Sequence, residues 1–441
     1  MQRLTLVLLG LLISFGVRAE GNWTIIHAGT LLAVPGVAPK THQSVIIRDG
    51  RIIDVKAGFI SPKTVTPDGD VRIVDLSQRF VLPGLMDLHT HLTSSRLDNA
   101  LANKLRAVTK SDADNALSAF ANAKRTLLAG FTTVRNLGSH GRAVFALRDA
   151  IAHGVVAGPR ILVAGSTISS TGGHGDIHGF RQDVMNVLAS PTICDGADSC
   201  RRAVRFAVKR GSDWIKIMAT GGVLDESNAG TDQQLTDDEL RAIVETAHAL
   251  GRKVAAHAQG LNGINAALRA GVDSIEHGSF LDASSLKLFK QTGAYLVPTL
   301  MPPFVLVDKA RTSTTIPPAI RAKILSVGPM KDRSVRRALK GGIKIAFGTD
   351  AGVYRHGRNA KEFELLVQAG MSEMAAIETA TVNAADLLGL SDQIGTIEKG
   401  KAADMIAVSD SPLKDITELQ RVVFVMRNGR VYKDEKETAS Q

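Results

Sequence analysis

Eight short apolar runs alternate with helical patterns across the middle of this 441-residue chain. The expected strands are Val81–Leu88, Phe131–Leu137, Ile161–Ala164, Trp214–Met218, Val254–Ala256, Ser274–Glu276, Tyr295–Leu300 and Ile343–Phe347. The segments between them carry helical patterns, as in Asp237–Leu250, where Thr236 and Glu239 make a capping box. Eight strands with intervening helices over about 310 residues predict a parallel (β/α)8 barrel of the TIM type, with its chemistry at the carboxyl ends of the strands.

Both ends of the chain are rich in β-forming residues. Residues 22–80 hold strand-like runs around an Asp49-Gly50 turn, and the C-terminal end holds similar runs around an Asn428-Gly429 turn. We expect one small composite β-sandwich formed by both ends, whereas two unrelated small sheets are the alternative. The predicted boundaries are 20–80 for the first part of the sandwich, 81–390 for the barrel, and 391–441 for the second part and a C-terminal tail.

Residues 1–19 have the pattern of a secretory signal peptide. Arg3 supplies a positive start, Leu4–Val17 is an apolar stretch, and Val17-Arg18-Ala19 offers small residues at the cleavage positions. The apolar stretch is too short to span a bilayer comfortably, although an uncleaved anchor is the alternative. We expect a secreted, periplasmic protein without a stable membrane anchor, with a mature start near Glu20.

Export to an oxidising compartment would allow the two cysteines to form a disulfide. Cys194 and Cys200 lie in PTICDGADSC, a loop-like segment with Gly and Asp between them. In an oxidising compartment they are expected to close a small disulfide, and the alternative is two unpaired thiols in a loop.

The net charge of +10 comes from basic residues that are scattered along the chain rather than clustered. Aromatic residues make up only 4% of the chain, so stacking side chains for bases are scarce. This pattern argues against nucleic-acid binding and supports only a modest attraction for anionic substrates or envelope surfaces.

The end of the first expected strand carries His89-Thr90-His91. A strand period of two places both imidazoles on one face, where they can share a metal ion, although an isolated pair of this kind is more often structural. Lys216 lies inside the apolar run Trp214–Met218. A lysine in such a strand is costly unless it is neutralised, paired or chemically altered, or unless its end escapes to solvent.

Three further polar residues end expected strands. His257 follows Val254–Ala256, His277 follows Ser274–Glu276, and Asp350 ends the run that follows Ile343. In a parallel barrel all these strand ends meet at one face. Together with His89, His91 and Lys216 they predict a metal centre.

Five motifs give the chain a specific resemblance. PGLMDLHTHL, WIKIMATGG, AAHAQG, SIEHGS and FGTDAG, in this order, resemble the amidohydrolase superfamily. The TGGHGD loop (171–176) and ATVNAADLLGL are similar to its imidazolonepropionase-like branch. That branch contains Xaa-Pro dipeptidases, zinc carboxypeptidases and enzymes that cleave the amide of ochratoxin, an N-acylated phenylalanine. The resemblance covers nearly the whole mature chain.

The resemblance implies two zinc ions, or other divalent metals, per chain. His89 and His91, with Asp350, would hold the more buried ion, and the second would be held by two further histidines, His257 and His277. It implies that Lys216 is an N6-carboxylysine, a carbamate formed from CO2 that bridges the metals and replaces a buried cation with an anion. Asp350 would act as general base and then as general acid. Self-assembly into a homo-oligomer is also implied.

The loops that follow the strands are expected to bind and orient the substrate. His140, His174 and His356 are candidates for polarising the scissile carbonyl or contacting the substrate, and Arg355 with His356 for binding a carboxylate. The expected reaction is hydrolysis of the amide bond of a dipeptide or an N-acyl amino acid with a free C-terminal carboxylate.

Three alternatives stay open at this point. A cyclic-amide hydrolase like imidazolonepropionase would use the same centre. A mononuclear deaminase would not be expected to place Lys216 on the fourth strand, and it often has a glutamate where this chain has Gly260. A metal-free scaffold characteristically loses ligands, whereas every ligand position is filled here.

Overall fold

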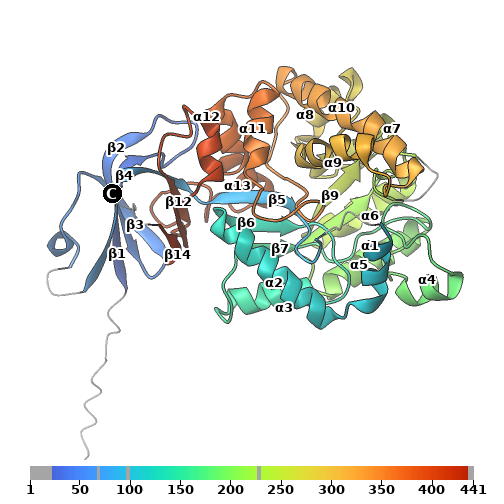
Figure 1. Cartoon of the computed structure of the whole chain (residues 1–441), viewed down its shortest axis with the longest axis horizontal. Helices are drawn as coiled ribbons and strands as arrows, with labels where there is room; N and C mark the ends of the chain where they lie inside the picture. Colours follow the sequence, from blue (N-terminus) through green and yellow to red (C-terminus); the bar gives the residue numbers. More distant parts are fainter. Residues whose placement is uncertain (1–21, 67–69, 96–99, 226–229, 436–441) are drawn as a thin grey trace, which may run out of the picture.

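The computed structural model describes residues 22–66, 70–95, 100–225 and 230–435. Strands from the two ends of the chain lie together at one end of the molecule, and most helices surround the middle segment at the other (Figure 1). The predicted signal peptide falls outside the described ranges. Within those ranges, no helix is both long enough and apolar enough to cross a membrane.

The terminal strands form one seven-stranded sheet in the order β14-β13-β12-β4-β1-β2-β3. The N-terminal strand β1 pairs in parallel with β4, and the C-terminal strand β12 pairs antiparallel with the other edge of β4. The two ends therefore share one sheet rather than forming two separate ones. Its strands are β1 (Trp23–Leu31), β2 (Lys40–Arg48), β3 (Arg51–Ala57), β4 (Val71–Pro83), β12 (Met405–Val408), β13 (Phe424–Arg427) and β14 (Arg430–Asp434), with 3-10 turns η1 (Pro62–Thr64) and η2 (Ile416–Gln420).

Both expected hairpin turns are confirmed. Asp49 and Gly50 have φ of 49° and 79°, and Asn428 and Gly429 have φ of 47° and 74°, as a tight two-residue turn requires. A Cβ added at Gly429 would lie 2.7 Å from the Cα of Gly50. The two turns therefore pack directly on each other, and this contact joins the two ends of the chain.

The middle of the chain forms two parallel sheets. The first has the order β5-β6-β7, with β5 (Leu85–Thr90), β6 (Phe131–Asn136) and β7 (Arg160–Val163). The second has the order β11-β10-β9-β8, with β8 (Trp214–Met218), β9 (Lys253–Ala258), β10 (Ser274–His277) and β11 (Tyr295–Val297). Single parallel bridges continue these sheets: Ile168↔Ile217, Leu296↔Ile345 and Thr90↔Ala351.

The connecting segments are helical. The capping box at the start of α6 is confirmed, because Thr236 and Glu239 cap each other's backbone. The helices are α1 (Ala100–Thr109), α2 (Asp112–Leu128), α3 (Ala143–Ala152), α4 (Gln182–Leu188), α5 (Ala197–Lys209), α6 (Asp237–Ala249), α7 (Leu261–Ala270), α8 (Ala283–Thr292), α9 (Met301–Thr312), α10 (Pro318–Lys340), α11 (Lys361–Gln368), α12 (Glu373–Thr379) and α13 (Val382–Leu388).

Three expected strands differ clearly from the structure, one of them because the run Tyr295–Leu300 is regular only over β11 (Tyr295–Val297). The run Val81–Leu88 divides at Gly84, so that its first part belongs to β4 and its second part to β5. A Cβ at Gly84 would lie 2.3 Å from Thr132 Oγ1, so only glycine fits where the chain passes from one sheet to the next. The run Ile343–Phe347 makes one bridge, at Ile345, instead of a regular strand.

Cys194 and Cys200 are joined in a disulfide just before and within the first turn of α5. Both residues are buried against the main hydrophobic core. The alternative of two unpaired thiols is therefore wrong in this structure.

Candidate active site

One cavity of about 570 Å³ lies at the carboxyl ends of the parallel strands. The strands bring the expected ligands to this cavity. His89 lies near the end of β5 and His91 directly follows that strand. Lys216 lies in β8, His257 in β9 and His277 at the end of β10, and Asp350 follows the bridge at Ile345. All six expected ligand residues line this cavity: His89, His91, Lys216, His257, His277 and Asp350. The parallel arrangement therefore gathers side chains that are up to 261 positions apart in the sequence.

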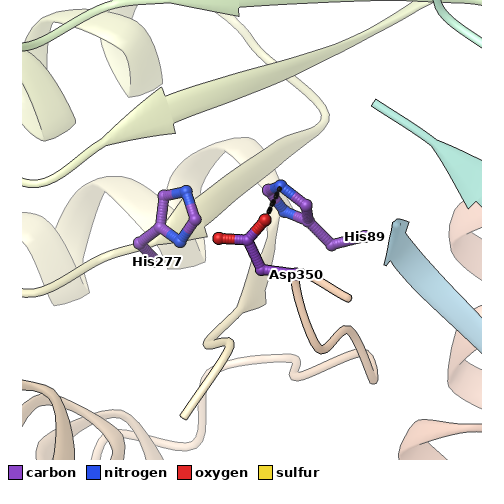
Figure 2. Close-up of side chains that lie close together, drawn as sticks. All are labelled: His89, His277 and Asp350. Atoms are coloured by element: carbon purple, nitrogen blue, oxygen red, sulfur yellow. Dashed lines mark ion pairs between the residues drawn. The ribbon is translucent and has the colours of Figure 1, made fainter. Parts of the chain in front are cut away.

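The histidine rings lie close to one another. The ring centroids of His89 and His277 are 4.9 Å apart, those of His257 and His277 4.6 Å, and those of His89 and His91 5.4 Å. Figure 2 shows the carboxylate of Asp350 between the rings of His89 and His277. One ligand atom from each of these three residues falls within 4.8 Å of the others, which suits a metal ion.

The tightest cluster differs in one respect from the expected grouping. His277, which we expected to hold the second metal with His257, lies with His89 and Asp350. His91 remains next to this cluster, because its Nε2 is 3.2 Å from Oδ1 of Asp350 and its Nδ1 faces the carbonyl of Gly138. Within the described residues, the ligands thus form one continuous group rather than two separate ones.

Lys216 is buried, with 1% of its surface exposed. Its Nζ has no hydrogen-bond partner among the described residues, so the alternative of a lysine that reaches solvent is wrong. Burial lowers the pKa of this amine to about 8, although Glu276 and Asp350 favour its charged form. A buried amine without a partner, surrounded by imidazoles and a carboxylate, fits a metal centre bridged by a carbamate.

A buried ion pair that the sequence reasoning missed holds His89. Nδ1 of His89 donates to Oε2 of Glu276 (2.8 Å), and Nη2 of Arg135 donates to Oε1 of the same carboxylate (2.8 Å). The guanidinium lies over the ring of Trp214 at 4.4 Å. Burial alone would raise the pKa of Glu276, but Arg135 and His89 outweigh it and lower the pKa to about 2. This ionised carboxylate leaves Nε2 of His89 free of a proton and available to a metal.

Asp87 joins the two chain segments that carry His89 and Asp350. Its Oδ1 accepts from the backbone N–H of His89 and of Thr349 (both 3.1 Å), and its Oδ2 accepts from the side chains of Thr349 (2.5 Å) and Asn359 (2.7 Å). The signal for Asp87 and Glu276 was present in the sequence, because both are carboxylates inside apolar strands that must find partners.

Two ligand residues adopt left-handed backbone conformations. His277 has φ of 74° and Asp350 has φ of 59°, and both are non-glycine residues. Such conformations cost on the order of 1–3 kcal/mol and persist where the surroundings enforce them. Both strained residues line the same cavity, which indicates that their backbone conformations serve to direct their side chains into it.

A lysine on α10 supports His277 through Thr299. Nδ1 of His277 lies 2.7 Å from Oγ1 of Thr299. The ammonium of Lys331 donates to Oγ1 and to the backbone oxygen of Thr299, both at 3.0 Å. Lys331 is buried and lines the cavity. Its role could not be inferred from the sequence, because α10 reaches the site only through the fold.

Of the three loop histidines that we expected to approach the centre, His140 and His174 do so, whereas His356 does not line the cavity. His140 and His174 line the cavity, and the His174 ring lies 4.4 Å from that of His257. Nδ1 of His174 donates to Oδ2 of Asp225 (2.6 Å), whose Oδ1 accepts from Lys323 of α10 (2.7 Å). Asp225 and Lys323 thereby fix the orientation of His174.

The two residues expected to bind a carboxylate lie elsewhere. Arg355 is exposed and is not among the described residues that line the cavity. His356 is buried and also does not line the cavity: its Nε2 donates to the backbone oxygen of His91 (3.3 Å) and its Nδ1 faces Thr126 Oγ1 (3.3 Å). Both residues were expected at the site because they follow Asp350 closely in the sequence. In the structure Arg355 is exposed, and His356 contacts the backbone of His91 instead.

One side of the cavity is largely apolar. Its wall away from the metal ligands comes from α9, α10 and the segment after β8. The apolar residues that line it there are Val223, Leu224, Pro302, Pro303, Leu306, Ile320, Ile324 and Val327. The cavity therefore combines a polar, histidine-rich floor with an apolar side.

Residues 80–432 match the Amidohydrolase family, and the chain belongs to this family. It is a hydrolase that acts on C–N bonds.

The relatives cover nearly the whole chain. The chain is 30% identical to the ochratoxinase of Aspergillus niger in an alignment 434 residues long that covers 94% of this chain and 87% of that protein. The crystal structure of a Xaa-Pro dipeptidase with methionine bound in its active site is 40% identical, covers 93% of this chain and 100% of that one, and superposes with a TM-score of 0.86. A prolidase crystallised with N-methylphosphonate-L-proline is 30% identical. The match covers 94% of this chain and 100% of that one, with a TM-score of 0.83. These relatives confirm the superfamily and branch that the motifs resemble.

Proposed function

We propose that this chain is a binuclear, zinc-dependent amidohydrolase that cleaves the amide bond of dipeptides or N-acyl amino acids with a free C-terminal carboxylate. The observation that carries the proposal is the buried, unpartnered amine of Lys216 amid three buried histidines and Asp350 in one cavity. Imidazole and carboxylate ligands favour zinc over calcium or magnesium.

In this proposal, His89, His91 and Asp350 hold one metal ion, and His257 and His277 hold the second. The position of His277 beside His89 and Asp350 allows it to face either ion. The neutral amine of Lys216 would add to carbon dioxide with release of one proton, and the carbamate so formed would supply anionic oxygen ligands to the centre. Two divalent metals in such a centre supply a nucleophilic oxygen at neutral pH and polarise a bound carbonyl.

The residues of the chain then move the proton and orient the substrate. Asp350 accepts the proton of the attacking water on its carboxylate and passes it to the departing amine nitrogen, so that acid and amine are released. His174, which is held through Nδ1 by Asp225, presents its other nitrogen for contact with the scissile carbonyl oxygen. His140, also on the cavity wall, is the alternative for this contact.

The likeness to named relatives supports the substrate class. A dipeptidase relative holds methionine in its active site, a prolidase relative binds a phosphonate analogue built on proline, and another relative is an ochratoxinase. Methionine and proline carry free carboxylates, and both are apolar amino acids. The apolar side of the present cavity suits the same kind of group.

We also propose the finer architecture that the sequence predicts. The parallel bridges at Ile168, Ile345 and Ala351 support an eight-stranded barrel closed through the segment 345–351, which contains Asp350. The seven-stranded sheet is proposed as the composite β-sandwich, with the boundaries 20–80, 81–390 and 391–441. A leader over residues 1–19, a periplasmic location and a homo-oligomeric state belong to the same proposal.

A substrate panel with the zinc-loaded mature enzyme tests the function. We expect turnover of Xaa-Pro dipeptides or N-acyl amino acids, measured by release of the free amino acid. Exclusive turnover of a cyclic amide, or release of ammonia from an aminated ring with one metal per chain, would replace this proposal by one of the two enzymatic alternatives.

A further inference from the structure

We propose that one face of α10 selects the leaving amino acid: Lys331 binds its carboxylate, and Val327 and Ile324 bind an apolar side chain. This inference rests on the proposed function and names the C-terminal residue that the site prefers. The three residues line the same cavity as the metal ligands.

The spacing along the helix places these residues in one row. Ile320, Ile324, Val327 and Lys331 follow each other at intervals of four, three and four positions, which keeps them on one helical face. With a rise of about 1.5 Å per residue, Val327 lies about 6 Å and Ile324 about 10 Å along the axis from Lys331. The row therefore changes from cationic to apolar over the length of one amino-acid residue.

Lys331 lies at the end of this row that is next to the metal centre. Its ammonium donates twice to Thr299, and Oγ1 of Thr299 is in contact with His277. An ammonium has three hydrogens, so these two bonds leave one donor. Among the described residues, Thr299 is the hydrogen-bond partner of Nζ and no carboxylate lies within ion-pair distance of it, although Lys331 is only 4% exposed. Asp350 and Glu362 favour the charged form of the amine from farther away. A buried cation of this kind, on the wall of a cavity, is suited to an anionic partner from the substrate.

The covalent structure of the substrate matches this order. In an amide of an amino acid, the carboxylate and the side chain branch from the carbon next to the scissile nitrogen. A scissile bond at the metal ligands therefore brings the carboxylate close to them, where Lys331 lies, and the side chain beside it. The apolar wall of Val223, Leu224 and Leu306 faces the outer part of the row and packs with Ile324. This arrangement excludes polar side chains, because their burial without partners is costly.

The test compares N-acetyl-L-leucine, its C-terminal amide and N-acetylglycine, with acetate release as the readout. We expect the enzyme to prefer the free acid to the amide by about ten- to hundredfold in kcat/KM, as a charge-assisted hydrogen bond supplies. Lys331→Met should abolish this preference, and Lys340→Met, on the exposed end of the same helix, should keep it. An equal loss for acid and amide in Lys331→Met would show a purely structural role and overturn the proposal.

The assignment of Ile324 to the apolar side-chain site is tested with substitutions at two neighbouring positions. Ile324→Ser should reduce the preference for leucine over glycine about tenfold or more, while Leu325→Ser, whose side chain is exposed, should leave it unchanged. Equal preferences in Ile324→Ser and the unaltered enzyme would contradict the assignment of this face.

Calorimetry separates this inference from the proposed function. L-leucine should bind the metal-loaded enzyme at least about tenfold more tightly than L-leucinamide, and Lys331→Met should remove the difference. If none of the amides is hydrolysed but this difference is found, the proposed function fails and the carboxylate site stands. If the amides are hydrolysed and the difference is absent, the function stands and the carboxylate site is refuted.

Discussion

Replacing Glu276 by glutamine tests the buried pair that holds His89. One oxygen of Glu276 accepts from Arg135 (2.8 Å) and Ser274 (2.5 Å), and the other accepts from His89 (2.8 Å). A glutamine has only one oxygen. If that oxygen stays with Arg135, its NH2 group faces Nδ1 of His89, and two donors oppose each other unless the imidazole moves its proton to Nε2. That proton would block the nitrogen assigned to the metal.

The size of the effect follows from burial. Arg135 and Glu276 are both 0% exposed, and removing one charge from a buried pair costs about 3–5 kcal/mol of unfolding free energy. Losing the support of a metal-binding histidine lowers metal affinity by about 10–100-fold. Urea unfolding with metal chelated measures the first quantity, and titration with a competing chelator measures the second.

A surface pair provides the control for Glu276→Gln. Glu398 is half exposed and pairs with Lys401 at 3.0 Å, so Glu398→Gln should change the unfolding free energy by less than about 1 kcal/mol. Glu276→Gln with the stability and metal affinity of the unaltered chain would refute the role of this carboxylate as the support of His89.

Three further predictions follow from the same structure. Asp350→Asn should lower kcat by on the order of 10² or more, because the amide cannot accept the proton, and rate measurements at equal metal occupancy check this. Asp225→Asn should lower kcat more than it raises KM, because His174 loses the ionised carboxylate that orients it; a purely structural role would lower the melting temperature without changing this ratio. Replacing Cys194 and Cys200 together by serine should cost about 2 kcal/mol of unfolding free energy, as expected for such a short loop, and an equal stability with and without reductant would contradict this.

The metal ligands could be predicted from the sequence because parallel strands bring their carboxyl ends to one face. His89, Lys216 and His277 each interrupt or end an apolar run, so the strand pattern alone places them together. The expected eighth strand, Ile343–Phe347, is not a regular strand in the structure and makes a single parallel bridge at Ile345.

The substrate-facing residues could not be predicted in this way. Lys331 lies in a long helix whose sequence is rich in basic residues, and only its burial against Thr299, which follows β11, distinguishes it from its exposed neighbours. Arg355 follows Asp350 closely in sequence, yet its loop points it outward. The direction in which a loop leaves a strand depends on contacts far away in the chain, such as that of His356 with His91.

The most direct test of the proposed centre is the state of Lys216. Enzyme prepared with isotope-labelled bicarbonate should show a carbamate carbon by NMR and contain about two zinc ions per chain. Lys216→Ala should lose the carbamate signal, most of the metal and turnover, whereas Lys340→Ala should retain all three. A fully active enzyme with an unmodified Lys216, or full metal content and activity in Lys216→Ala, would contradict the binuclear centre.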